Sequence, residues 1–310
     1  MINVIKLDSI PSDLNEKMCE FEESFRYPLG SSGTFSISHG DDYGRFFRAM
    51  GKSRIYLACH HGEVVGSLAM VQRPLNINGN NVNSLYIGDL KIKRKNGRVL
   101  YCLIKEAHDD NIDLRDIPQY GIMMKGTEKR PSDYTGRMGL PKFKNMGEVG
   151  IIRVPVQKNY RKEKFSQIGI SGALSLAEEL RDQEYSFPIG RPNIRSLNEP
   201  KGFCLEDKSS VCILEDTLTA KRLFDDKGEE IVSGHLSSFQ YGKPKEGVQL
   251  VEAIMPEAEA NGYPALFFSV PIEDKDIFLK ELEGSNCAPA FVYGRNMERA
   301  HRWQLNTSEI

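Results

Sequence analysis

A basic segment that contains one glycine is the part of this chain whose residue types best suit a chemical task; it reads Lys93-Arg94-Lys95-Asn96-Gly97-Arg98. Apolar residues recur at helical spacing from Val99 onward, so we expect a helix to begin there. The first N–H groups of a helix lack partners inside it, and the helix dipole adds partial positive charge at that end. The segment therefore predicts a seat for a phosphate or pyrophosphate group. A solvated basic turn is the alternative, and nothing in it matches a Walker loop or a GxGxxG motif.

Strand-forming residues flank this segment and its helix, at 82–92 before and at 120–125 after. Strand, helix and strand at this spacing form a βαβ unit, whose two strands are parallel and joined by a right-handed crossover. Further strand-like runs lie at 2–7, 54–59, 64–71 and 148–156. The first half of the chain is therefore expected to fold as a mixed sheet flanked by helices, in the α/β (α+β) class.

Residues 86–103 resemble the coenzyme A-binding motif of the GNAT superfamily of N-acetyltransferases. In that family a strand ending in Leu-x-Val precedes an Arg-x-x-Gly-x-Gly/Ala loop. The matching residues here are Leu90-Lys91-Ile92, followed by Arg94-Lys95-Asn96-Gly97-Arg98-Val99. Val99 stands where the family has a small residue. Residues 56–66 look like the family's second and third strands, and the element order over 2–156 is also the family's.

The resemblance implies direct transfer of an acetyl group from acetyl-CoA to an amine, without a covalent enzyme intermediate. It implies that the main chain of Leu90, Lys91 and Ile92 holds the pantetheine arm and the thioester carbonyl. The phosphates would lie on the residues that follow: Lys93, Arg94, Lys95, Asn96, Gly97, Arg98 and Val99. A preorganised N–H near the developing oxyanion would stabilise the transition state.

Two residues are candidates for proton transfer. Asp89 is the candidate base, because in an alternating strand it shares a face with Lys91 rather than with Leu90 and Ile92. Tyr134 is the candidate donor to the leaving thiolate, because 133–140 is similar to the family's late Tyr-x-x-x-Gly-Phe segment with the tyrosine one residue out of register. A structural carboxylate and a core or surface tyrosine are the alternatives.

The last third of the chain repeats the order of the first half. Shifted by 150 positions, Lys93, Lys95, Gly97 and Leu100 fall on Lys243, Lys245, Gly247 and Leu250. This predicts a GNAT-like domain at 1–156, a connector at 157–200 and a smaller, degenerate GNAT-like domain at 201–310. Glu246 places an acid where phosphate would approach, and Pro256 should interrupt the following helix. We expect the second copy to serve as packing, as a wall of the acceptor cleft or as a homodimer surface.

Composition limits the partners. The chain has 310 residues and a formal net charge of −2, so no global field recruits nucleic acid, and a nucleic-acid binder would use the local basic patch at residues 91–98. The six cysteines lie far apart without a CxxC pair, and no metal-ligand constellation or catalytic Ser/His/Asp set is found. The N-terminus lacks a signal-peptide pattern and no apolar run reaches membrane-spanning length, which favours a cytoplasmic protein. The hypotheses are an N-acetyltransferase acting on a small-molecule amine, a non-catalytic acyl-CoA binder, and a nucleic-acid binder.

Overall fold

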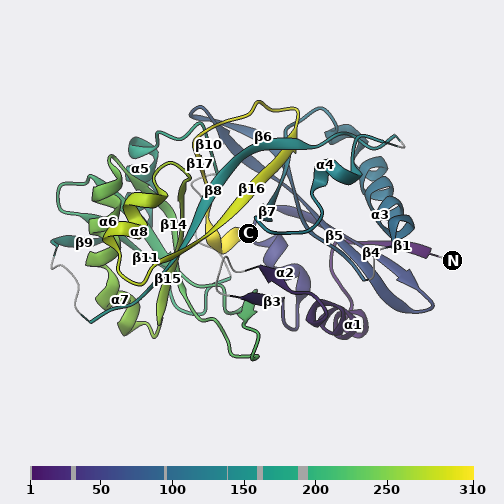
Figure 1. The fold of residues 1–310 in the computed structure, drawn as a ribbon, viewed down its shortest axis with the longest axis horizontal. Helices are drawn as coiled ribbons and strands as arrows, with labels where there is room; N and C mark the ends of the chain where they lie inside the picture. The colour runs from purple at the N-terminus through teal and green to yellow at the C-terminus, as the bar shows by residue number, and fades with distance from the viewer. Residues whose placement is uncertain (1, 29–32, 94–95, 138, 159–162, 188–194) are drawn as a thin grey trace.

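Strands from both halves of the chain join in one sheet in the computed structural model, which describes residues 2–28, 33–93, 96–137, 139–158, 163–187 and 195–310 (Figure 1). The main path runs β1-β4-β5-β6-β7-β16-β8-β15-β14-β12-β11-β9. Its strands are β1 (Ile2–Leu7), β4 (Lys52–His60), β5 (Glu63–Ile77), β6 (Asn80–Ile92), β7 (Gln119–Met124), β8 (Lys144–Pro155), β9 (Phe165–Ile168), β11 (Lys201–Leu205), β12 (Ser210–Glu215), β14 (Gly234–Tyr241), β15 (Ala265–Pro271) and β16 (Asn286–Arg295).

The strand order is the same when read outward from the middle of the sheet. On one side lie β7, β6, β5 and β4, and on the other β15, β14, β12 and β11. In each half the third and fourth of these strands in chain order are parallel, and the other neighbours are antiparallel. The last strand of each half pairs with the other half. β8, from the first half, pairs with β15 of the second, and β16, from the second half, pairs with β7 of the first. β8 and β16 also pair with each other. The structure therefore repeats one unit about the β8–β16 pair.

Helices cover both faces of the sheet because strand residues alternate between two cores. Ile55 and Leu57 belong to the core beneath α1 and α2, whereas Tyr56 and Ala58 pack beneath α3. In the second half α5 and α6 take the corresponding places. The helices are α1 (Ser12–Glu23), α2 (Tyr43–Arg48), α3 (Gly97–Asp110), α4 (Pro131–Tyr134), α5 (Ile170–Leu180), α6 (Pro244–Ala253), α7 (Met255–Ala260) and α8 (Lys275–Glu281). None of the described helices is long and apolar enough to cross a bilayer.

Five short strands lie outside the main path or in a second sheet. β2 (Tyr27–Pro28), β3 (Thr34–Ser38) and β13 (Arg222–Phe224) form a small sheet that joins the two halves, because β3 from the first pairs with β13 from the second. β10 (Tyr185–Ser186) and β17 (Trp303–Gln304) pair with each other, and β10 also pairs with β5. The C-terminal segment, with the 3-10 turn η2 (Thr307–Glu309), returns to the centre of the molecule (Figure 1).

Several local expectations can be compared with the structure. Helix α6 ends at Ala253 and α7 begins at Met255, so the break expected at Pro256 is confirmed. Leu218 precedes strand β13, which starts at Arg222, because the Asp216 carboxylate binds the N–H groups of Leu197, Asn198 and Leu218 and holds the chain in a turn. The repeat is confirmed, but its spacing is 149 positions between β6 and β14, and 147 between β7 and β15 and at the helix start, rather than 150 throughout.

Candidate functional site

Strands β6 and β7 separate soon after they meet. Among the described residues they pair at Leu85–Gln119 and Tyr86–Tyr120, although both strands continue for at least four residues beyond that point. Gly121 lies where they part, and a Cβ atom there would lie 2.6 Å from the carbonyl oxygen of Ile87. Glycine therefore permits the close approach that precedes the opening.

A cavity of about 360 Å³ occupies this opening. The first half lines it with residues of β6, β7 and α3, among them Leu90, Ile122, Met124 and Ile104. The second half contributes Lys221, Leu223, His235, Phe267 and Thr307. The walls are mostly apolar with a few polar groups, as in ligand sites in general, and both halves build them.

A β-bulge shapes the cavity wall in β6. Ser67 pairs with Lys91 and Ala69 with Gly88, so Leu68 alone faces both Asp89 and Leu90. Asp89 has φ of 53°, in the left-handed region, where aspartate is tolerated better than most residues. The Ser67 hydroxyl donates to the Asp89 carbonyl at 2.9 Å and supports the distorted backbone. The bulge thereby turns main-chain groups of β6 toward the opening between the strands.

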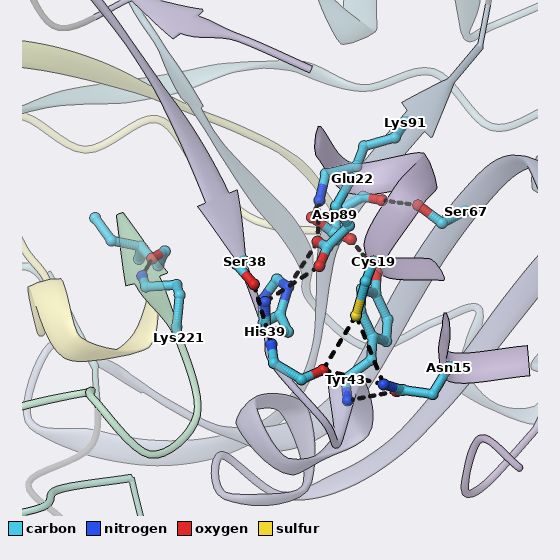
Figure 2. A network of polar contacts seen from close by, with 12 residues as sticks. Asn15, Cys19, Glu22, Ser38, His39, Tyr43, Ser67, Asp89, Lys91 and Lys221 are labelled. Carbon is cyan, nitrogen blue, oxygen red and sulfur yellow. Dashed lines mark hydrogen bonds and ion pairs between the residues drawn. The ribbon is translucent and has the colours of Figure 1, made fainter. Parts of the chain in front are cut away.

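The Asp89 side chain belongs to a buried charged cluster (Figure 2). Lys91 Nζ lies 2.7 Å from Asp89 Oδ1 and 2.5 Å from Glu22 Oε1, and the Tyr43 hydroxyl donates to Asp89 Oδ2. Burial opposes the charge of Glu22, but His39 and Lys91 outweigh it and lower the pKa of Glu22 to about 2. Burial likewise opposes the charge of Lys91, yet Asp89 and Glu22 raise its pKa above the usual value. Glu22 and Lys91 are therefore both ionised at neutral pH.

His39 completes this cluster and was missed by the sequence analysis, as was Glu22. The Glu22 carboxylate accepts hydrogen bonds from the backbone N–H of His39 at 3.1 Å and from its ring Nδ1 at 2.7 Å. His39 lines the cavity, with its ring packed near Tyr43 and two phenylalanines of α2. A histidine placed directly after the strand 34–38, in the sequence Ser38-His39-Gly40-Asp41-Asp42, is the signal that was available.

The predicted phosphate seat is described in part, since Arg94 and Lys95 lie outside the described residues. Lys93, Gly97 and Arg98 are exposed, and the space around Gly97 is open. The Asn96 side chain caps α3 by accepting hydrogen bonds from the N–H groups of Arg98 and Val99, at 3.1 and 3.3 Å. Two of the N–H groups expected for a phosphate thus already have a partner inside the protein.

The other predicted residues lie at or beside the cavity. Val99 is buried, and its extra bulk is accommodated by Gly66, whose added Cβ would lie 2.9 Å from Val99 Cγ1. Ile92 packs in the same core, while the Lys91 side chain points into the charged cluster. Tyr134 ends α4 and lines the cavity; burial, with a smaller effect of Asp133, raises its pKa, so its hydroxyl keeps its proton at neutral pH. Asp89, Leu90 and Tyr134 therefore share one cavity.

Lys221 reaches this cavity from the second half (Figure 2). Its Nζ donates to the main-chain oxygen of Ile310 and lies 4.7 Å from the centroid of the Phe46 ring. Burial, assisted by Arg195, lowers the pKa of Lys221 to about 7. The two buried lysines at the site thus have pKa values shifted in opposite directions. The pKa of Lys91 is raised because it has two carboxylate partners, whereas Lys221 contacts a main-chain oxygen and its pKa is lowered.

The second half contains a counterpart of this opening that is filled. Strands β14 and β15 pair at Gly234–Leu266 and His235–Phe267 and then part, as β6 and β7 do. A bulge begins at Ser238, whose φ is 50°. Asn306 Oδ1 accepts a hydrogen bond from the Ser238 N–H at 2.9 Å, and the Gln304 side chain donates to the Phe239 carbonyl. The C-terminal segment therefore occupies the position that the cavity occupies in the first half.

Solved structures resemble this chain in shape, although neither a scan of protein-family models nor a search of curated proteins found a match. N-myristoyltransferase of Saccharomyces cerevisiae, solved with bound myristoyl-CoA and inhibitors, is 11% identical with a TM-score of 0.67, over 100% of this chain and 83% of that one. The GCN5-related N-acetyltransferase from Anabaena variabilis is 12% identical with a TM-score of 0.52, over 94% and 72%. The one from Kribbella flavida is 10% identical with a TM-score of 0.51, over 94% and 71%.

At these identities the likeness is one of fold, and it extends over both halves of the chain. The parallel strand pair that parts at a bulge, the crossover helix α3 and the repeated strand order agree with that fold. This chain therefore has a GNAT-type fold, and its second half repeats the strand order of the first.

Proposed function

We propose that this protein is an acyl-CoA-dependent N-acyltransferase that moves an acyl group, acetyl in the case that the sequence favours, to the primary amine of a small molecule. The observation that carries the proposal is the contrast between the two bulges. In the first copy the bulge at Asp89 borders a cavity, whereas in the second copy amide side chains bind the bulge at Ser238.

The filled copy indicates which ligand groups the open copy suits. A carbonyl oxygen of Asn306 accepts from the Ser238 N–H, and an amide N–H of Gln304 donates to the Phe239 carbonyl. At a spacing of 149 positions, the corresponding groups are the Asp89 N–H and the Leu90 carbonyl. The pantetheine arm of coenzyme A carries amides with the same donors and acceptors. An acyl-CoA laid along β6 would therefore make hydrogen bonds that the second copy makes internally.

The rest of the cofactor has places along the same path. The main chain of Leu90, Lys91 and Ile92 is proposed to hold the pantetheine arm and the thioester, and residues 93–99 the phosphates. Exposed Lys93 and Arg98 supply charge at the start of α3, where the helix dipole adds to it. The apolar wall of the cavity, with Leu90 and Ile122, suits an acyl chain.

Transfer requires that the amine lose a proton and that the thiolate gain one. Tyr134 remains the proposed donor to the thiolate, because its raised pKa keeps the hydroxyl protonated. Asp89 remains one of two proposed groups on the amine side, where its carboxylate attracts the acceptor ammonium. The second group is His39, which lies in the wall of the same cavity. The acceptor cleft would be shared by the two halves, taken as residues 1–156 and 201–310 with 157–200 between them.

Non-catalytic binding of acyl-CoA is the second candidate function. It is favoured by the engagement of both Asp89 oxygens, one by Lys91 and the other by Tyr43, because both oxygens of this carboxylate already have partners within the protein.

Thiol release distinguishes the two functions. Purified protein is mixed with acetyl-CoA or with myristoyl-CoA and a panel of primary amines, free coenzyme A is measured with a thiol reagent, and the acylated amine is identified by mass. A transferase releases thiol in proportion to acylated amine. A binder shows saturable affinity by calorimetry with thiol release no faster than buffer, and that result would reject the proposed reaction.

A further inference from the structure

His39 lies in the cavity wall with one ring nitrogen bound and the other unengaged. Glu22 Oε1 lies 2.7 Å from His39 Nδ1, and Glu22 Oε2 binds the His39 backbone N–H, so one carboxylate fixes both the main chain and the ring (Figure 2). No hydrogen bond reaches Nε2 from any residue that the structure describes. The ring also lies near Tyr43, with centroids 4.8 Å apart, which restricts its rotation.

The charge of Glu22 determines which nitrogen carries the proton. Its pKa of about 2 means that the carboxylate is ionised and has no hydrogen to donate. The contact with His39 Nδ1 therefore requires a hydrogen on Nδ1. In the neutral ring the lone pair then lies on Nε2, the nitrogen available to a ligand in the cavity. Carboxylate, imidazole and open nitrogen are the arrangement by which an enzyme orients a histidine base.

The cluster around His39 lacks one positive charge. Two carboxylates, Glu22 and Asp89, share a single ammonium, Lys91, so with a neutral imidazole the buried group carries a net charge of −1. One nitrogen or carboxylate oxygen from each of His39, Glu22 and Asp89 lies within 4.8 Å of the others. A proton on His39 would balance the charge, and an unbalanced buried charge is costly. Among the described residues, six titratable groups face the ring or its charged partners. They are Glu22 of α1, Tyr27 of β2, Tyr43 of α2, Asp89 and Lys91 of β6, and Lys221, which contacts Phe46 from the second half.

From this geometry we infer that His39 Nε2 receives the proton that the acceptor amine must lose, and that Glu22 positions the ring for it; the inference rests on the proposed acyl transfer. The ammonium of the acceptor gives its proton to Nε2, and its freed lone pair forms a bond to the thioester carbon. The carbon–sulfur bond then breaks, and the coenzyme A thiolate takes a proton from Tyr134. The second proton on the attacking nitrogen leaves through solvent and restores the Tyr134 hydroxyl, so the products are an amide and a free thiol. The carboxylates of Glu22 and Asp89 balance the charge of the imidazolium, so Asp89 assists without accepting the proton itself.

The tautomer of His39 tests the positioning without any substrate. Protein labelled with nitrogen-15 in its histidines is compared with His39→Gln to assign the His39 signals by long-range proton–nitrogen correlation at pH 8.5. We expect a hydrogen on Nδ1 and none on Nε2, and a mixed or reversed tautomer in Glu22→Gln, whose amide can donate to Nδ1. A hydrogen on Nε2 in the wild type would overturn the inference whether or not the protein turns over any amine.

The pH dependence of thiol release tests the role in the reaction. With acetyl-CoA and an amine that the wild type accepts, His39→Gln should lower turnover by roughly 10²-fold or more at neutral pH and remove the acidic limb of the profile. The affinity of His39→Gln for acetyl-CoA should stay within about threefold of the wild-type value, a free-energy difference of RT ln 3. His61→Gln, at a hairpin tip, is the matched control and should match the wild type.

Three results would overturn the assignment. One is a His39→Gln profile with the same shape as the wild type. Another is loss of the acidic limb in Lys221→Met instead, which would move the proton acceptor to the second half of the cavity. The third is an absence of thiol release from the wild type with every amine, which would reject acyl transfer itself, while the tautomer measurement would still report separately on the Glu22–His39 pair.

Discussion

Asp89 and Ser238 occupy the same place in the two halves of the protein, 149 positions apart. Each begins a bulge in the strand before the crossover helix, and each has a left-handed backbone, with φ of 53° and 50°. Their surroundings differ, because Asp89 borders the cavity and the Ser238 N–H is bound by Asn306. The repeat has thus kept its backbone distortion in both copies, while in the second copy the chain itself fills the cleft.

Charge reversal at the start of α3 should weaken cofactor binding. Arg98→Glu and Lys93→Glu should each reduce the affinity for acetyl-CoA by roughly tenfold or more, since a charge-assisted contact contributes about 1.5–3 kcal/mol. Both side chains are exposed, so stability should change little. Lys243→Glu, at the start of α6 in the filled copy, is the control and should leave the affinity measured by calorimetry unchanged. Equal losses in all three variants would mean that the basic loop is not the phosphate seat.

Two glycines near the site should respond to alanine in opposite ways. At Gly121 the new Cβ would lie 2.6 Å from the Ile87 carbonyl oxygen, so Gly121→Ala should cost about 1–3 kcal/mol through strand displacement. At Gly97 the space is open and the residue begins a helix, so Gly97→Ala should keep or slightly raise stability. Urea unfolding of the ligand-free proteins measures both. A stable Gly121→Ala would show that β6 and β7 part for another reason.

Removal of the Asp89 charge should affect turnover more than cofactor affinity. In Asp89→Asn the cluster loses a negative charge that stabilises a proton on the His39 ring. Thiol release from acetyl-CoA should therefore fall by about 10–10²-fold at neutral pH. The deficit should shrink at high pH, where more of the amine is already neutral. A loss that is flat across pH and matched by an equal loss of thermal stability would make Asp89 a structural carboxylate.

Glu309 should make stability depend on pH. Burial opposes its charge, but Arg73 at 2.8 Å and Arg195 at 3.1 Å lower its pKa from 4.5 to about 2. A depressed carboxyl pKa stabilises the fold above the unfolded value and loses that effect as pH falls through the folded value, here between 4.5 and about 2. The shift corresponds to about 3 kcal/mol. Glu309→Gln should be less stable than the wild type by about that amount at pH 7, and the difference in urea unfolding should narrow toward pH 2.

Local sequence signals were enough for the part of the site that lies in one βαβ unit. The strand, the basic loop and the amphipathic helix from Val99 are neighbours in sequence, and the internal repeat was visible as a shift of the same elements. Asp89 was selected by strand alternation with Lys91, and the two side chains do meet.

The remaining features depend on contacts between distant segments. Glu22 reaches Lys91 across 69 positions, and His39 joins them from the loop before α2, so no short spacing predicts the cluster. The bulge at Asp89 inserts one residue into β6, and the alternation of residue types along the strand does not predict it. In the second copy, the side chains that fill the opening between β14 and β15 are Gln304 and Asn306 of the C-terminal segment. The path of this segment is set by the pairing of β17 with β10 rather than by its own sequence.

Hydrogen exchange of the full-length protein, with and without saturating acetyl-CoA, tests the central claim that one copy binds acyl-CoA and the other is filled by the chain itself. We predict that the ligand slows exchange of backbone amides at the bulge of β6 and at the start of α3, near Leu90 and Arg98. Amides of β14 near Ser238 should already exchange slowly and should not change. Protection that appears in β14 on addition of acetyl-CoA, or no protection in β6, would contradict the account.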